Sequence, residues 1–261
     1  MPNARQLRSF IAKLINPSKM PQEEPPAYDQ SFVELVAPLD LSFRDSLLSM
    51  YRGESQLGSD GKRHQPDSTT KVYPSQGMWL YNFCLSTFPK ATLEIGMAYG
   101  YSTLYFLAAI QKNGLGQHTA IDPFQHSAWD GIGLAHALAH SAARSDAFRF
   151  IEDRSDLCAA DLRRAGSRFD LIFIDGNHRY DDVLTDFYLY SPLCSIGGHI
   201  VFDDLWMSSV QTVTAFVIAN RQDFVELPTK EKNIKVFKKL EEDSRPWNHF
   251  RSFAVSPSSV P

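Results

Sequence analysis

The sequence has few cysteines, no excess of basic residues and no long apolar run. Its three cysteines, Cys84, Cys158 and Cys194, form no C-x-x-C pair and no even-numbered disulfide framework. We therefore expect reduced thiols in a cytoplasmic protein. The formal net charge of -4 leaves no basic surface for nucleic acid, so a small molecule is the expected partner. No secretory signal or membrane-spanning segment is expected either.

Changes in composition divide the chain into three parts. Residues 1–74 predict a helical extension that opens with an amphipathic helix, followed by a proline-rich linker and a polar lid over 52–74. The first helix is expected to pack on its own chain or to make a homodimer. Residues 75–245 predict the main domain, and 246–261 a frayed tail.

Strand and helix patterns alternate regularly through the main domain. Such alternation predicts an α/β fold of Rossmann-like type, with a doubly wound, mostly parallel sheet. The last two strands are separated by Pro-Thr-Lys-Glu-Lys-Asn, a hairpin signal that predicts an antiparallel strand at the edge. The seven predicted strands are 91–95, 119–122, 148–152, 169–175, 199–203, 224–227 and 234–237.

The stretch around which the domain is organised is Thr-Leu-Glu-Ile-Gly-Met-Ala-Tyr-Gly-Tyr-Ser-Thr-Leu, residues 92–104. A short strand runs into Gly96 and Gly100, and a helix begins near Ser102. Glycines permit a positive φ or the close approach of a ligand. Glu94, near the end of the strand, suits a ligand that carries an amino group and a sulfonium better than it suits a polyphosphate.

The glycine spacing separates this loop from two nucleotide-binding motifs. The G-x-G-x-x-G pattern would need glycine where Ala98 and Tyr101 stand, and no G-K-[ST] follows. The remaining pattern, Glu94-x-Gly96-x-x-x-Gly100, resembles motif I of the class I methyltransferases that use S-adenosylmethionine (SAM). A strand-turn-helix that has its glycines for geometry alone is the structural alternative.

Three residues at the ends of the second and third predicted strands extend this resemblance. Asp122 ends the second strand, where a carboxylate can accept hydrogen bonds from both ribose hydroxyls. The resemblance implies the same role for Asp122, and it implies contacts to the adenine edge for Asp153 and Ser155. His126 and Trp129 stand where a ring could cover the adenine, although simple packing explains an aromatic there equally well.

A second constellation consists of three carboxylates. Asp175 closes the fourth strand and Asp203 the fifth, with Asp204 beside it, so all three should meet at one rim of the sheet. Their mutual repulsion favours a bound cation, and hard oxygen ligands favour Mg²⁺. The pattern resembles metal-dependent O-methyltransferases, most nearly the group of macrocin O-methyltransferase, which acts on sugar hydroxyls. Alternatively, Asp203 and Asp204 only cap the next helix.

His178 lies three positions beyond Asp175 in the same rim loop. An imidazole that titrates near neutrality can take the proton of an acceptor hydroxyl, so we predict His178 as the general base. The acceptor is then a small-molecule hydroxyl, and the resemblance favours a sugar or glycoside over a phenol. The aromatic candidates for its pocket are Tyr99, Tyr101, Tyr180 and Trp206.

The sequence therefore predicts a SAM-dependent O-methyltransferase assisted by Mg²⁺ or another divalent cation. One rival is an NAD-dependent oxidoreductase on the same sheet, which Ala98 and Tyr101 disfavour. The other is a non-catalytic SAM-binding protein, which would need neither the aspartate trio nor a base.

Overall fold

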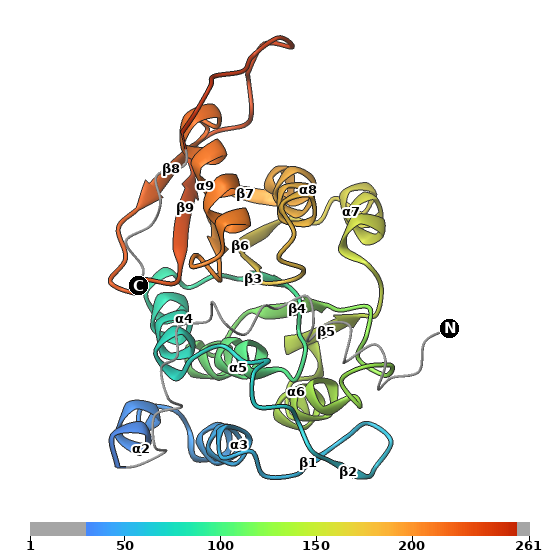
Figure 1. The fold of residues 1–261 in the computed structure, drawn as a ribbon. Coiled ribbons are helices and arrows are strands. Elements are labelled where there is room, and N and C mark those ends of the chain that lie inside the picture. Colours follow the sequence, from blue (N-terminus) through green and yellow to red (C-terminus); the bar gives the residue numbers. More distant parts are fainter. Residues whose placement is uncertain (1–29, 255–261) are drawn as a thin grey trace.

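The computed structural model describes residues 30–254, which form one seven-stranded sheet with helices on both faces (Figure 1). The strand order across the sheet is β5-β4-β3-β6-β7-β9-β8. The strands are β3 (Ala91–Ile95), β4 (Gln117–Ile121), β5 (Phe148–Ile151), β6 (Phe169–Ile174), β7 (Cys194–Phe202), β8 (Phe224–Leu227) and β9 (Lys235–Lys239).

The helices divide into two groups, one on each face of the sheet. In Figure 1 the helices from the first half of the chain lie below the sheet and those from the second half lie above it. The first group is α2 (Gln30–Val36), α3 (Leu41–Tyr51), α4 (Pro74–Thr87), α5 (Tyr101–Asn113) and α6 (Ile132–Ser141). The second group is α7 (Ser155–Arg164), α8 (Tyr180–Tyr190) and α9 (Ser208–Asn220).

The pairing of the strands confirms the predicted fold class. Strands β5, β4, β3, β6 and β7 pair in parallel, and β9 pairs antiparallel with both β7 and β8. The reversed strand β9 thus lies one place in from the edge, and β8 forms the edge itself. The chain order changes direction between β3 and β6, and open α/β sheets bind ligands at such a switch point, beyond the carboxyl ends of the strands.

Residues of the central strands alternate between two cores because successive side chains point to opposite faces of a sheet. On β6, Leu171 and Phe173 pack with the first group of helices, whereas Ile172 and Ile174 pack with the second. All four side chains are buried. Burial on both faces explains why the last four residues of β6, 171–174, are all apolar.

The extension before the main domain differs in detail from its prediction. Within the described residues the helical part of this extension consists of two helices, α2 and α3, separated by a turn that contains Pro38, which fits the inability of proline to continue a helix. The predicted first amphipathic helix lies outside the described residues, and so does the end of the tail. Within residues 30–254 no helix is both long enough and apolar enough to cross a membrane.

The predicted lid contains a small antiparallel hairpin, β1 (Gln56–Leu57) and β2 (Arg63–His64), which packs against the loop before α6. A Cβ added to Gly58 would lie 2.3 Å from the carbonyl oxygen of Asp130. A Cβ added to Gly131 would lie 1.9 Å from the hydroxyl oxygen of Ser59. The two backbones therefore approach each other at a distance that only glycine allows.

The contact between α7 and α8 contains a buried carboxylate, Asp186. It is 4% exposed and accepts a hydrogen bond of 2.5 Å from the hydroxyl of Ser155 at the start of α7. Burial raises the pKa of Asp186 to about 7, while the Ser155 hydroxyl lowers that pKa and the charges of Asp182 and Asp156 raise it. The folded state therefore holds this proton more tightly than the unfolded state does.

Replacing Asp186 with Asn should make the protein more stable at high pH. Below about pH 4 the Asp186 carboxyl is protonated in both the folded and the unfolded state, so it does not lower the stability of the wild type. As the pH rises towards 7 the unfolded chain ionises first, so the folded state loses stability relative to it. The advantage of Asp186→Asn should grow by about 2 kcal/mol between about pH 5.5 and about pH 8, since one pKa unit is worth about 1.4 kcal/mol.

Urea unfolding at the two pH values measures this difference. Ser155→Ala serves as the comparison, because loss of the donating hydroxyl should raise the Asp186 pKa further and steepen the pH dependence. Equal stability differences at both pH values would contradict a raised pKa for Asp186.

Candidate active site

The backbone ladder of the sheet continues one residue beyond four strand ends. Each of these four residues donates its N–H to the last carbonyl of a neighbouring strand. The bonds are Gly96 to Ile121 at 2.9 Å, Asp122 to Ile151 at 3.2 Å, Asp175 to Ile95 at 3.0 Å and Asp203 to Ile174 at 3.2 Å. The structure therefore brings four predicted site residues to one edge of the sheet.

Gly96 and Gly100 both have left-handed backbone conformations, with φ of 91° and 84°. A Cβ on Gly96 would lie 2.1 Å from the Asp175 carbonyl oxygen, and a Cβ on Gly100 would lie 2.8 Å from the Cα of Gly133. The sequence had suggested that glycines make room for a ligand. Here the protein's own backbone also requires both glycines. Gly96 is required because β3 and β6 end in direct contact, and Gly100 because its loop contacts the backbone of Gly133.

Asp122 fixes the glycine loop in place. Its Oδ2 accepts the N–H groups of Met97 and Ala98 at 3.1 and 2.8 Å. Its Oδ1 accepts the Phe124 N–H at 2.7 Å and the Trp129 indole N–H at 3.2 Å. Burial raises the pKa of Asp122, and the four donors oppose that rise. The predicted ribose ligand is thus the residue that holds the end of β4 to the loop after β3.

Glu94 has no exposed surface. Its carboxylate accepts the hydroxyls of Ser102, at 2.8 Å, and Thr103, both in the first turn of α5. The Nε2 atom of His118 lies 3.2 Å from the same carboxylate, although it makes no well-aligned hydrogen bond there. Glu94 and Ser102 therefore fix the start of α5 against β3, and neither side chain is free at the surface of the edge.

The residues predicted to surround an adenine have mixed surroundings. Asp153 is exposed at the end of β5, and the Ser155 hydroxyl donates to Asp186. Trp129 packs edge-on against Tyr99, with ring centroids 5.2 Å apart, so its ring belongs to the support of the loop. His126 is exposed, and its Nδ1 lies 2.6 Å from a Glu152 oxygen.

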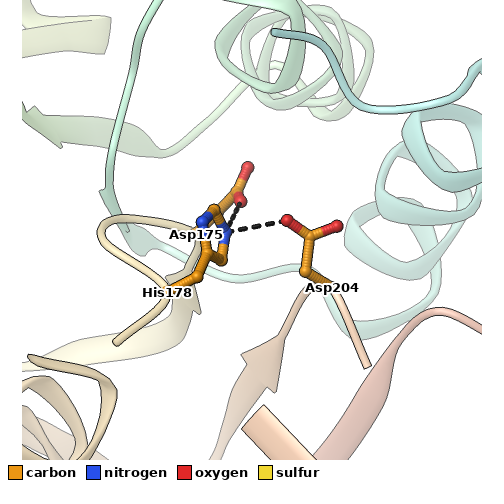
Figure 2. A group of neighbouring side chains, drawn as sticks. All are labelled: Asp175, His178 and Asp204. Atoms are coloured by element: carbon orange, nitrogen blue, oxygen red, sulfur yellow. Dashed lines mark ion pairs between the residues drawn. The ribbon is translucent and has the colours of Figure 1, made fainter. Parts of the chain in front are cut away.

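Asp175, His178 and Asp204 form a cluster between the ends of β6 and β7 (Figure 2). Each side chain offers one ligand atom, and these atoms all lie within 4.8 Å of one another. The Nε2 of His178 is 2.7 Å from Asp204 Oδ2 and 3.5 Å from Asp175 Oδ1. Neither approach has hydrogen-bond alignment, so the buried Nε2 has no hydrogen-bond partner.

The charges of this cluster shift its pKa values strongly. Burial raises the pKa of Asp175 to about 7, and Asp204 adds to the rise while His178 opposes it. Burial alone would lower the His178 pKa, but Asp204 and Asp175 outweigh it and raise that pKa well above its usual value. A cation, whether a proton on the imidazole or a metal ion, is therefore stabilised between the two carboxylates.

Asp203 has other partners than the predicted metal ion. It is 3% exposed, and its Oδ1 accepts the side-chain amides of Gln76 at 2.5 Å and Asn233 at 3.3 Å, together with the Asp204 N–H at 2.8 Å. Burial raises the pKa of Asp203 well above its usual value, and the charges of Asp175 and Asp204 add to this. Asp203 thus lies beside the cluster without belonging to it.

Gln76 and Asn233 were not predicted from the sequence. Gln76 is in the first turn of α4, and Asn233 precedes β9, so neither follows a parallel strand in the way that marked the aspartates. Asn233 also donates to Asp204 Oδ1 at 3.3 Å. A polar residue near a helix start or in a hairpin turn has an ordinary structural explanation, and no signal distinguished these two.

The aromatic candidates for an acceptor pocket separate into two pairs. Tyr99 and Tyr101 are buried in the first core, where the Tyr101 hydroxyl donates to the Met50 carbonyl. Tyr180 is 43% exposed at the start of α8. Trp206 is half-buried, and its indole N–H donates to Asp204 Oδ1 at 2.8 Å. Only Tyr180 and Trp206 therefore lie where an acceptor could reach them.

Comparison with known proteins finds a family model and relatives that are similar to part of this chain. Residues 93–205 match a family described as a methyltransferase domain. The O-methyltransferase hkm8 of Aspergillus hancockii is 26% identical over 151 residues, which are 58% of this chain and 57% of that protein. The uncharacterized protein R132 of Acanthamoeba polyphaga mimivirus is 40% identical over 57 residues, 20% of this chain and 26% of that protein. The chain thus covers less than two thirds of the length of either curated relative.

Solved structures share the fold. The O-methyltransferase TomG of Streptomyces achromogenes, in complex with SAM, is 20% identical with a TM-score of 0.60, covering 85% of this chain and all of that one. The methyltransferase PaMTH1 of Podospora anserina, bound to S-adenosylhomocysteine, is 17% identical with a TM-score of 0.60, covering 85% of this chain and 98% of that one. These matches show that the chain shares the fold of these methyltransferases, within which residues 93–205 match the methyltransferase-domain family.

Proposed function

We propose that this protein transfers the methyl group of SAM to a hydroxyl oxygen of a small molecule, assisted by a divalent cation, with Mg²⁺ as the first choice. The observation that carries the proposal is that one edge of the sheet holds both the glycine loop and the Asp175–His178–Asp204 cluster. Both the cofactor's methyl group and an activated hydroxyl could therefore lie at the same place. The similarity to hkm8, an O-methyltransferase, supports the choice of oxygen as acceptor.

We assign the cofactor to the loop between β3 and α5. Gly96 and Gly100 would lie against the cofactor. Asp122, which holds the glycine loop to the end of β4, would lie beside the ribose. Glu94 and Ser102 would act as positioning residues, because both are buried and bonded to each other. Asp153, which is exposed, and Ser155 keep their predicted place beside the adenine.

The cluster fits a hard divalent ion. Asp175 and Asp204 offer carboxylate oxygens from two neighbouring strand ends, and the unpartnered His178 Nε2 lies between them. An ion held by the two carboxylates would supply alignment and acidity to the acceptor hydroxyl, and its charge would favour the neutral form of the imidazole. Asp203 stays the proposed third ligand, and its Oδ1 also accepts the amides of Gln76 and Asn233.

His178 is proposed as the general base. It accepts the hydroxyl proton while the acceptor oxygen forms its bond to the methyl carbon and the bond from that carbon to sulfur breaks. The products are a methyl ether and S-adenosylhomocysteine. Holding the two reactants at near-attack distance can itself supply roughly 7–11 kcal/mol of the barrier reduction.

We further propose a sugar or glycoside as the acceptor, as the resemblance to the macrocin O-methyltransferase group implies. Trp206, whose indole N–H donates to Asp204 Oδ1, and Tyr180, which is exposed two positions after His178, offer ring surface on which a sugar face could stack. A cytoplasmic location is proposed with it, because Cys84, Cys158 and Cys194 are all buried free thiols.

Calorimetric titration with SAM and with NADH tests the cofactor assignment. We expect SAM to bind and NADH not to bind. Methyl transfer is then measured on a panel of glycosides and phenols with Mg²⁺ and with chelator. Binding of SAM with no turnover on any hydroxyl would favour a non-catalytic protein, and binding of NADH would favour an oxidoreductase.

Asp122→Ala should weaken SAM binding by roughly tenfold or more, because four donors would lose their acceptor and the glycine loop would loosen. Asp170→Ala is a matched control. Asp170 also accepts two backbone N–H groups, those of Lys90 and Ala91, but at the opposite end of β3. Calorimetry should find near-normal SAM affinity in Asp170→Ala, and equal losses in the two variants would refute a specific role for Asp122.

Asp204→Ala should reduce methyl transfer by about 100-fold or more and leave SAM affinity within a few fold, because it removes one of the ion's proposed carboxylate ligands. Removal of metal by chelator should have the same effect on the wild type, and added Mg²⁺ should restore only the wild type. Full activity of metal-free wild type would exclude the metal role.

His178→Ala should lower kcat by roughly 10²–10⁴-fold, the usual contribution of a general base, with little change in Mn²⁺ affinity. Electron paramagnetic resonance of free Mn²⁺ measures that affinity. A loss of Mn²⁺ binding as large as that in Asp204→Ala would make His178 a ligand and not the base.

A further inference from the structure

The two adjacent carboxylates after β7 face different ways. Asp204 points to His178 in the cluster, whereas Asp203 points to Gln76 and Asn233 (Figure 2 shows Asp204). The Asp203 Oδ1 has three donors: the side-chain amides of Gln76 and Asn233, which lie outside the cluster, and the backbone N–H of Asp204. A pair of neighbouring aspartates therefore divides into one residue that faces the ion site and one that is held by amides.

The orientation of Asp204 depends on an unusual backbone conformation. Asp204 has φ of 55°, in the left-handed region that side chains with a Cβ rarely adopt. Its N–H donates to Asp203 Oδ1 at 2.8 Å, which stabilises this turn from the residue before it. If the Asp203 carboxylate moved, the Asp204 backbone would lose that acceptor and its carboxylate would lose its direction.

Gln76 fixes the Asp203 carboxylate from a distant part of the chain. It is 2% exposed, and its Nε2 donates to Asp203 Oδ1 at 2.5 Å. Its Oε1 accepts the N–H of Tyr73 at 2.7 Å, so the amide is held at both ends and its orientation is determined. Gln76 thus joins the start of α4 to the rim of the sheet, across 127 positions of sequence.

We propose that Gln76 is a positioning residue for the ion site and acts through Asp203. Its amide holds the Asp203 carboxylate, that carboxylate holds the left-handed turn of Asp204, and the turn aims the Asp204 carboxylate at the ion. Asn233 contributes to the same arrangement with longer bonds, of 3.3 Å, to both aspartates. The inference rests on the proposed metal role of Asp204.

Gln76→Met tests the proposal, since methionine fills a similar volume and has no amide. Mn²⁺ affinity is measured on the purified full chain by electron paramagnetic resonance, with SAM affinity measured by calorimetry. We expect Mn²⁺ binding to weaken by roughly tenfold, the lower part of the range for residues that orient ligands, and SAM affinity to stay within a few fold. Unchanged Mn²⁺ affinity in folded Gln76→Met would overturn the inference.

A double-mutant cycle separates positioning from a general loss of structure. Because Gln76 acts through Asp203, Gln76→Met should cause no further loss of Mn²⁺ affinity in an Asp203→Ala background. Independent losses that multiply would contradict the proposal. Asn220→Leu is the matched control, because Asn220 is an equally buried amide whose bonds, to Arg251 N–H and carbonyl, lie away from the rim. Its Mn²⁺ affinity should match that of the wild type.

Two further outcomes are distinguished by the same experiment. If wild type itself binds no Mn²⁺, the proposed metal role fails, and the inference about Gln76 fails with it. If the wild type binds Mn²⁺ and the Gln76 variants bind it equally tightly, the metal role stands and only the inference about Gln76 is wrong. Should Gln76→Met fail to fold, Gln76→Glu keeps an acceptor for the Tyr73 N–H and replaces the donor to Asp203 with a carboxylate, whose repulsion should displace Asp203 and also weaken Mn²⁺ binding.

Discussion

The contact between the backbones of Gly96 and Asp175 is the constraint on which the rest of the site depends. At this point β3 and β6 end so close together that a single added carbon atom would meet the Asp175 carbonyl. The contact fixes the distance between the glycine loop and the carboxylates of the rim. The relative position of these two parts is therefore set by the sheet itself, and not by flexible side chains.

The carboxylates at this rim would repel one another without nearby donors or a cation. The structure provides for each in a different way: Asp122 has four N–H donors, Asp203 has two amides and a backbone N–H, and Asp175 and Asp204 share His178. Only the last pair leaves a position for a cation between its members. The distribution of hydrogen-bond donors, more than the number of aspartates, thus decides where positive charge can be held.

The sequence was sufficient for the sheet and for the edge at which the site lies, because strand periodicity and residues directly after strands are local signals. From it seven strands were predicted, with Asp122, Asp175 and Asp203 directly at the ends of parallel strands and therefore at one edge of the sheet. It could not predict which way each side chain turns, since that depends on distant partners. Glu94 is buried by hydroxyls from the next helix, and Asp203 is held by Gln76, 127 positions earlier. The left-handed backbone of Asp204 gave no signal either, because aspartate at a helix start has a simpler explanation.

The hairpin β1–β2 meets the loop before α6 through Gly58 on one side and Gly131 on the other. Each glycine leaves room for an atom of the opposite segment, so a larger residue at either position would displace both. Insertions or grafts that alter one segment alone should therefore be poorly tolerated. Evolution or engineering that reshapes this side of the molecule would have to exchange the two segments together, as a single module.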